Sequence, residues 1–136
     1  MNQIERNLYQ RERRKLNGNA YTKKYEKTKK GFLMRLYRNM KSRVTGVQKL
    51  KVHLYKGKFL LNKNEFYEWA INNSKFHELF NEWELSGYER RICPSVDRID
   101  SSLGYELTNM EFVPFHENCR RGLYSKLKKL YENNYL

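Results

Sequence analysis

The sequence predicts an α+β fold, with a mainly helical N-terminal half followed by a strand–turn–strand–helix unit at the C-terminal end. Apolar residues recur at helical spacing in several segments before residue 86. Two short apolar segments then flank a turn-forming stretch at residues 100–104. The last segment, from Phe115 to about Asn133, returns to helical spacing. A chain of 136 residues with this order of elements fits one domain with an extension.

The N-terminal region predicts two helices that differ in their apolar surface. Residues 2–16 form a charged helix that ends at Asn17-Gly18, a common stop signal. Its sparse apolar stripe is Ile4, Leu8 and Leu16. Residues 21–30 are basic and have no clear core face, whereas residues 31–43 form an amphipathic helix. Its apolar side is Phe32, Leu33, Leu36, Tyr37 and Met40. The other side, which we expect to meet phosphate, carries Arg35, Arg38, Lys41 and Arg43.

The middle of the chain contains one ambiguous segment and two predicted helices. Residues 47–62 fit either short strands or a loop with a helical turn. Residues 64–71 form a helix whose inward side chains are Phe66, Trp69 and Ala70. Ser74 is the expected N-cap of a second helix, which runs through Leu85. Gly87 is the expected stop signal after it. Its apolar stripe is Phe76, Leu79, Phe80 and Trp83. Aromatic residues in this pattern favour a core over a base-stacking surface.

The C-terminal unit is predicted from strand, turn and helix signals in succession. The first strand region is expected at residues 90–99, the turn at 100–104 and the second strand at 111–113. The final helix, 115–133, has an apolar stripe at Leu123, Leu127 and Leu130. Its exposed basic residues are Arg120, Arg121, Lys126, Lys128 and Lys129.

Charge divides the chain into a basic half and a nearly neutral half. Residues 1–58 hold 18 Lys and Arg against 3 Asp and Glu, a net charge of +15, whereas residues 59–136 carry a net charge of −2. Such a field attracts a polyanion. The alternative is a solvated charged tail, but the basic half also has periodic apolar and aromatic residues. We therefore expect a basic, largely helical nucleic-acid-binding region at 1–58, an aromatic-rich helical pair at 59–89 and the C-terminal unit at 90–136.

The two cysteines and the absence of long apolar segments indicate the compartment. Cys93 and Cys119 lie far apart and form no Cys-x-x-Cys pair, so a zinc site with four protein ligands is not expected. We expect reduced cysteines that fill small apolar spaces. No stretch approaches the roughly 20 apolar residues of a membrane span. The polar first residues lack the apolar region of a signal peptide, so we expect a cytoplasmic protein.

Three polar side chains lie near the joints of the C-terminal unit. Asp97 belongs to the first strand region, Asn109 precedes the second strand and Asn118 lies near the start of the final helix. Side chains at such joints can converge on one point, which a hydrophobic core never requires. A carboxylate and an amide oxygen suit a hard divalent cation such as magnesium. Because the chain is strongly basic, the obvious substrate for such a site is a nucleic-acid phosphate.

These residues resemble the core of the HNH, or ββα-metal, endonucleases of the phage and homing type. The matching pieces are Val96-Asp97-Arg98-Ile99, Asn109, Met110 to Val113 and Glu117-Asn118, within a motif that covers about 30 residues. A closer resemblance is to a phage subgroup with a block of the form SVDRIDSSxGY followed by Asn. The resemblance implies a C-terminal ββα-metal unit, a Mg²⁺ or Mn²⁺ cofactor and an intracellular site of action in a phage-infected host cell.

The resemblance also implies roles for individual residues. Asp97 and Asn118 match the metal ligands, and Asn109 matches the residue that bonds backbone across the loop and holds the hairpin in shape. Arg98 stands where most relatives have the histidine that acts as general base. Arg stays protonated in proteins, so it cannot accept a proton from water, but it can stabilise charge on a phosphate. His116 is the only nearby histidine and is the alternative base, unless a metal-bound hydroxide attacks.

The leading functional hypothesis is therefore a magnesium-dependent DNA endonuclease or nickase that hydrolyses the phosphodiester backbone. We expect DNA as the partner, with no membrane contact and no small-molecule cofactor besides the metal. The residues expected to contact DNA are Arg35, Arg38, Lys41, Arg43, Arg120 and Arg121. One alternative is an HNH-derived DNA-binding protein that lost catalysis with the histidine at position 98. Another is a basic interaction protein that targets an acidic host partner.

Overall fold

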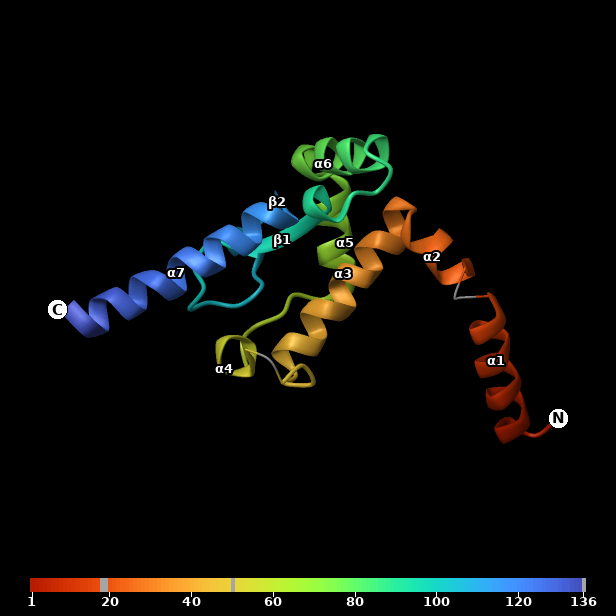
Figure 1. Cartoon of the computed structure of the whole chain (residues 1–136). Coiled ribbons are helices and arrows are strands. Elements are labelled where there is room, and N and C mark those ends of the chain that lie inside the picture. Colours follow the sequence, from red (N-terminus) through yellow and green to blue (C-terminus); the bar gives the residue numbers. More distant parts are fainter. Residues whose placement is uncertain (18–19, 50, 136) are drawn as a thin grey trace. The chain divides into compact units, whose positions relative to one another are not determined.

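The computed structural model of the chain describes residues 1–17, 20–49 and 51–135 (Figure 1). Packing divides the chain into two units, residues 1–35 and residues 36–136, and the division falls inside helix α3 (Lys29–Val44). The three regions expected from composition have different limits and stay a prediction. The α+β class is confirmed, because the described residues form helices and one two-stranded antiparallel sheet. No helix in the described part of the chain combines the length and apolar character needed to cross a membrane.

The first unit consists of α1 (Gln3–Asn17), α2 (Ala20–Glu26) and the first part of α3. Helix α1 begins with a reciprocal cap, in which the Asn2 side chain accepts from the Glu5 amide and the Glu5 carboxylate accepts from the Asn2 amide. The predicted helix is confirmed, but the Gly18 half of its stop signal lies outside the described residues. The side chains of residues 1–16 are exposed. Helix α2 has no buried residue, as expected from its lack of a core face.

The helices of the second unit confirm the predicted periodicity. After α3, the ambiguous segment contains the four-residue helix α4 (Val52–Tyr55), followed by α5 (Lys63–Ile71) and α6 (Ser74–Leu85). The expected N-cap Ser74 is wrong by one residue, because the Asn73 side chain accepts the Phe76 amide and Ser74 is already helical. The end of α6 is confirmed, since Gly87 follows with a φ of 75° that favours glycine.

The C-terminal unit is a hairpin followed by a long helix. Strand β1 (Pro94–Arg98) pairs antiparallel with β2 (Met110–Pro114), and α7 (Phe115–Tyr135) follows directly (Figure 1). The predicted strand at 90–99 is too long, because Arg90–Ile92 form the short 3-10 helix η1. A second 3-10 helix, η2 (Leu107–Asn109), precedes β2. The apolar stripe of α7 lies at the surface: Leu123, Leu127 and Leu130 are exposed.

The core lies between the hairpin and helices α5 and α6. Phe112 of β2 stacks on Trp69 at a centroid distance of 4.9 Å and contacts Phe76 at 5.1 Å. The predicted core role of the helical aromatics is confirmed, because Phe66, Ala70, Phe76, Leu79, Phe80 and Trp83 are all buried. Burying a Phe or Leu side chain completely contributes roughly 1.5–3 kcal/mol to the stability of the fold. This packing fixes the hairpin on one side.

A second contact ties the loop of the hairpin to residues 59–61. The Tyr105 amide donates to the Phe59 carbonyl at 2.7 Å, and the Leu61 amide donates to the Tyr105 carbonyl at 3.1 Å. The two segments approach so closely at Gly104 that a Cβ atom there would collide with the Phe59 backbone. A glycine is therefore required by space at this position, and Tyr105 beside it is 1% exposed.

Candidate metal and phosphate site

Asn109 holds the hairpin loop together. Its Nδ2 donates to the carbonyls of Gly104 and Asp100, at 2.8 and 3.0 Å, and its Oδ1 accepts from the Asp100 amide at 2.8 Å. The side chain is 3% exposed, and both polar atoms of the amide are satisfied. The expectation that Asn109 bonds the backbone across the loop is confirmed. A catalytic contribution beyond this positioning stays a prediction.

Asp100 closes the turn inside the same loop. Its Oδ1 accepts from the Ser102 amide at 2.9 Å and from the Ser102 hydroxyl at 2.6 Å. This is the local side-chain-to-backbone bonding that favours Asp in turns. The Ser102 hydroxyl and amide, which bond the charged form, lower the pKa of Asp100.

The strand register places Asp97 and Arg98 on opposite faces of the hairpin. Asp97 pairs with Glu111 and Arg98 pairs with Met110, and neighbouring residues of a strand point to opposite faces. Asp97 and Glu111 therefore share one face, which α7 accompanies, while Arg98 shares the other face with buried Phe112. This alternation determines the partners of both residues.

On the α7 face, Arg121 joins three carboxylates. It donates to Asp97 Oδ2 at 3.0 Å, to Glu117 Oε1 at 3.2 Å and also to Glu111. Hydrogen bonds to Glu111 and then Asp97 raise the pKa of Arg121, so its charge persists at every pH of interest. Glu117 also accepts from Arg120, and bonds from Arg120 and Arg121 lower the pKa of Glu117. Arg121, predicted to contact DNA, is instead engaged with acidic side chains here.

Asn118 faces the hairpin from the first turn of α7. Its Nδ2 donates to the Ser95 hydroxyl at 3.3 Å and to the Val96 carbonyl at 3.4 Å. Ser95 in turn donates to the Val113 carbonyl at 2.8 Å. Because the NH₂ group of Asn118 makes these two bonds, its Oδ1 is the atom that can accept a hydrogen bond from a ligand or coordinate a cation. Asn118 thus lies beside β1, next to the residue that precedes Asp97.

Arg98 is engaged with backbone and aromatic groups. Its Nη1 donates to the carbonyls of Leu54 and Leu103, at 3.0 and 3.1 Å. Its guanidinium carbon lies 4.1 Å from the centroid of the Tyr55 ring, within the range of a cation–π interaction. Arg98 therefore links α4 to the hairpin loop. This placement gives it an architectural role, whereas its predicted catalytic role stays a prediction.

His116 and the two cysteines occupy less constrained positions. His116 is exposed on the first turn of α7, two residues from Asn118. Neither cysteine forms a disulfide within the described residues: Cys93 is partly buried and Cys119 is exposed. The expectation that each fills a small apolar space is therefore wrong for Cys119, because its position in α7 faces solvent.

The basic residues predicted on α3 do not behave alike. Arg35, Arg38 and Lys41 are exposed, and Arg35 pairs with Glu26 at 3.7 Å. Arg43 is partly buried instead, and its Nη1 donates to the Tyr105 hydroxyl at 3.3 Å. Arg120 of α7 is exposed and paired with Glu117 at 2.7 Å. The phosphate-facing side predicted for α3 is thus solvent-exposed except at Arg43.

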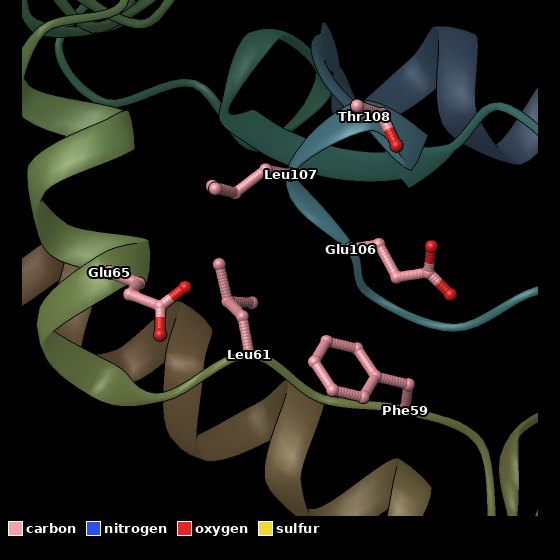
Figure 2. A pocket seen from close by; sticks show the side chains of 6 residues that line it. All are labelled: Phe59, Leu61, Glu65, Glu106, Leu107 and Thr108. Atoms are coloured by element: carbon pink, nitrogen blue, oxygen red, sulfur yellow. The ribbon is translucent and has the colours of Figure 1, made fainter.

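Two hollows mark the surface of the second unit. The larger, of about 410 Å³, is lined by Phe59, Leu61, Glu65, Glu106, Leu107 and Thr108 (Figure 2). It is open and holds none of the predicted site residues. The smaller, of about 80 Å³, lies between α3, β1 and the start of α7, and its lining includes Arg43, Ser95 and Asn118.

Sequence reasoning missed Glu111, Glu117 and Ser95 as neighbours of the candidate ligands. Strand register is the signal that finds Glu111, because a pairing that places Val96 opposite Phe112 also places Asp97 opposite Glu111. Within the described ranges, no group of three or more His, Cys, Asp or Glu side chains is arranged to hold a metal ion. Comparisons with protein-family models, curated proteins and solved structures found no match.

Proposed function

We propose that this protein is a magnesium-dependent DNA endonuclease or nickase of the HNH type, which also accepts Mn²⁺. The observation that carries the proposal is a pair of unused oxygen atoms. Asp97 Oδ1 and Asn118 Oδ1 accept no hydrogen bond from any described residue, while the other polar atoms of both side chains are engaged. One comes from the hairpin and the other from the helix that accompanies it.

The donor set fits the proposed cation. Magnesium prefers oxygen ligands, is held in many enzymes by one or two carboxylates, and keeps several of its waters. Asp97 supplies a carboxylate and Asn118 supplies an amide oxygen whose orientation is fixed by its bonds to β1. Two protein ligands leave most of the coordination positions of the ion to other oxygen atoms. Such a site stays open to water and phosphate.

The chemistry follows from this arrangement. A bound magnesium ion would polarise the phosphate and stabilise the negative charge on the leaving oxygen. Asp97 and Asn118 would hold the ion, and Asn109 keeps the loop between β1 and β2 in a single shape. His116, exposed near Asn118, is the proposed acceptor of the proton from the attacking water. The net charge of +13 supplies the long-range attraction to DNA.

The decisive experiment is nicking of supercoiled plasmid with and without Mg²⁺. Asp97→Asn keeps the shape of the side chain but removes the charge, and we expect no nicking above background. Asn118→Ala should behave in the same way, whereas Asn118→Asp, which keeps an oxygen ligand, should retain activity. Glu84→Ala, an exposed acidic residue of α6, is the matched control for charge. Normal cutting by Asp97→Asn would remove Asp97 from the metal site.

A second candidate function is DNA binding without catalysis. The observation that favours it is the engagement of Arg98 with the Leu54 and Leu103 carbonyls, where the resemblance calls for a catalytic base. In this case the wild type binds DNA with a strong salt dependence and fails to nick any plasmid with Mg²⁺ or Mn²⁺ between pH 6 and 9. Filter binding at two salt concentrations, beside the plasmid assay, separates the two functions.

A further inference from the structure

The small cavity between α3, β1 and α7 is lined in part by Arg43, which pairs with no carboxylate among the described residues. Its volume is about 80 Å³, and its polar lining comes from Asn39, Arg43, Ser95 and Asn118. One water molecule needs a cavity of roughly 10–15 Å³, so this cavity is large enough for a ligand of several atoms. It adjoins the candidate ligand Asn118, but its charged side chain comes from α3.

Arg43 differs from the other arginines of the site in its partners. Arg120 and Arg121 pair with carboxylates, and Arg98 bonds two backbone carbonyls. Within the described residues, Arg43 has one hydrogen bond, to the Tyr105 hydroxyl, and a guanidinium–ring distance of 5.6 Å to Tyr55. Burial raises the pKa of Tyr105, so its hydroxyl is neutral at physiological pH.

A partly buried guanidinium without a counter-ion is costly. Among the described residues, one hydrogen bond of Arg43 is formed, and its other donors have no partner there. Arg carries five N–H donors in a fixed planar fork, which matches the geometry of a phosphate. Asn39, one turn before Arg43 on the same side of α3, is partly exposed and has no hydrogen bond from its side chain to another described residue. The two side chains offer donors, and neither offers a negative charge.

We propose that this cavity binds one phosphodiester group of a nucleic-acid strand, held by Arg43 and Asn39 beside Asn118. The assignment to nucleic acid rests on the proposed function, whereas the binding of a phosphate group rests on the cavity and its charge. Arg43 donates two N–H groups to the phosphate oxygens, and the Asn39 amide donates a further bond. Arg43 thus differs in role from Arg35, Arg38 and Lys41. Their exposed positions suit a less specific attraction to the phosphate backbone of the nucleic acid.

The test uses the full chain without metal and inorganic phosphate as the probe. Phosphate is titrated while the NMR shifts of the Asn39, Ser95 and Asn118 amides are followed. We expect saturable shifts that cluster at these residues, and an affinity at least about ten-fold lower in Arg43→Gln, the scale of losing a charge-assisted bond. Lys63→Gln removes the same charge from an exposed position at the start of α5 and should leave the affinity unchanged.

Two further variants distinguish a ligand role from a structural one. Tyr105→Phe removes the hydroxyl partner of Arg43 and should preserve phosphate binding. Asn39→Ala leaves the contact of Arg43 with Tyr105 intact and should weaken binding, which keeps the proposal testable if Arg43→Gln fails to fold. Shifts that do not saturate, or an affinity that Arg43→Gln and Lys63→Gln lower equally, would overturn the phosphate site.

The source of the phosphate is tested by competition. A short DNA duplex should displace inorganic phosphate from the wild type, and this result supports the nucleic-acid assignment. Phosphate that binds but is not displaced overturns that assignment and identifies a site for small phosphates. Neither result depends on cutting, so a protein that binds phosphate here but never nicks plasmid would refute the proposed endonuclease and leave this cavity as a phosphate site.

Discussion

The two faces of the hairpin hold their charged residues in different ways. On the α7 face, Asp97 meets Arg121, whose contacts with Glu111 and Glu117 are also between side chains at the surface. On the opposite face, Arg98 bonds the carbonyls of Leu54 and Leu103 and lies over Tyr55. Of these two adjacent residues of one strand, Asp97 thus pairs with a charged side chain, whereas Arg98 contacts backbone carbonyls and an aromatic ring.

This difference separates groups that can change partners from groups that fix the backbone. Exposed ion pairs typically contribute less than about 1 kcal/mol, so Arg121 can exchange one partner for another at little cost. Bonds from a charged group to backbone carbonyls contribute about 1.5–3 kcal/mol, and breaking them also frees the loop. The α7 face is therefore the one on which a ligand can compete with existing contacts.

The largest effect on stability is expected at Asn109, which fixes the loop that both faces share. Asn109→Ala removes three hydrogen bonds and leaves backbone groups near Gly104 and Asp100 without this partner. We expect a loss of about 3 kcal/mol in the free energy of unfolding, measured by urea denaturation. Asn72→Ala, which removes one exposed side-chain bond to the Glu68 carbonyl, should cost less than about 1 kcal/mol. Equal losses in the two variants would refute the loop-clamp role.

Arg98 should give the next largest effect. Arg98→Ala removes two bonds to carbonyls and a contact with Tyr55, and we expect a loss of about 2 kcal/mol. Thermal or urea unfolding measures this loss of stability. Plasmid nicking under native conditions tests whether Arg98 instead acts on the phosphate. An unchanged stability together with a roughly 100-fold slower cleavage would mean that Arg98 acts on the phosphate rather than on the loop.

A smaller change in stability, with a clearer effect on metal binding, is expected at Arg121. Arg121→Gln should cost less than about 1 kcal/mol, because the Arg121 side chain is itself 43% exposed. Removing the cation beside Asp97 should also make that carboxylate a better ligand. The Mg²⁺ concentration for half-maximal nicking should then fall, provided that DNA affinity, measured separately, is retained. A higher requirement for Mg²⁺ would place Arg121 with the DNA instead.

The smallest effect concerns acid stability and Asp100. Its pKa is lower in the folded chain than in the unfolded one, so its contribution is present above the unfolded pKa of about 3.9 and is lost as pH falls through the folded value. Asp100→Asn keeps an acceptor for Ser102 but does not titrate. The difference in stability between wild type and variant should be constant above about pH 5 and shrink below pH 4. A difference that grows on acidification would contradict the assignment.

Periodicity predicted most of the fold because each signal lies within one segment. The apolar positions of α3, α5 and α6 recur every three or four residues, and Gly87 requires its positive φ in the structure. The N-cap of α6 was misplaced because Asn73 and Ser74 are both good caps, and only the bond to Phe76 distinguishes them. Residues 90–92 were assigned to a strand because no local signal marks the end of pairing at Pro94.

The candidate site was less predictable because its contacts join distant segments. Asn109 was found from the motif, and its bonds agree with the expected role. The partners of Arg98 include Leu54, 44 residues away, which no spacing within the motif reveals. Arg43 was placed among solvent-facing residues because helical spacing does not say that Tyr105 lies within its reach. Contacts of this kind depend on tertiary packing.

The close approach at Gly104 also constrains how this sequence can vary. No side chain fits between the loop and Phe59 while Tyr105 keeps its two backbone bonds to residues 59 and 61. Any relative that preserves this junction should therefore have glycine at the matching position, for reasons of space rather than of backbone angle. A relative with a larger residue there must have moved one segment away from the other, so this one position indicates whether the two segments stay joined.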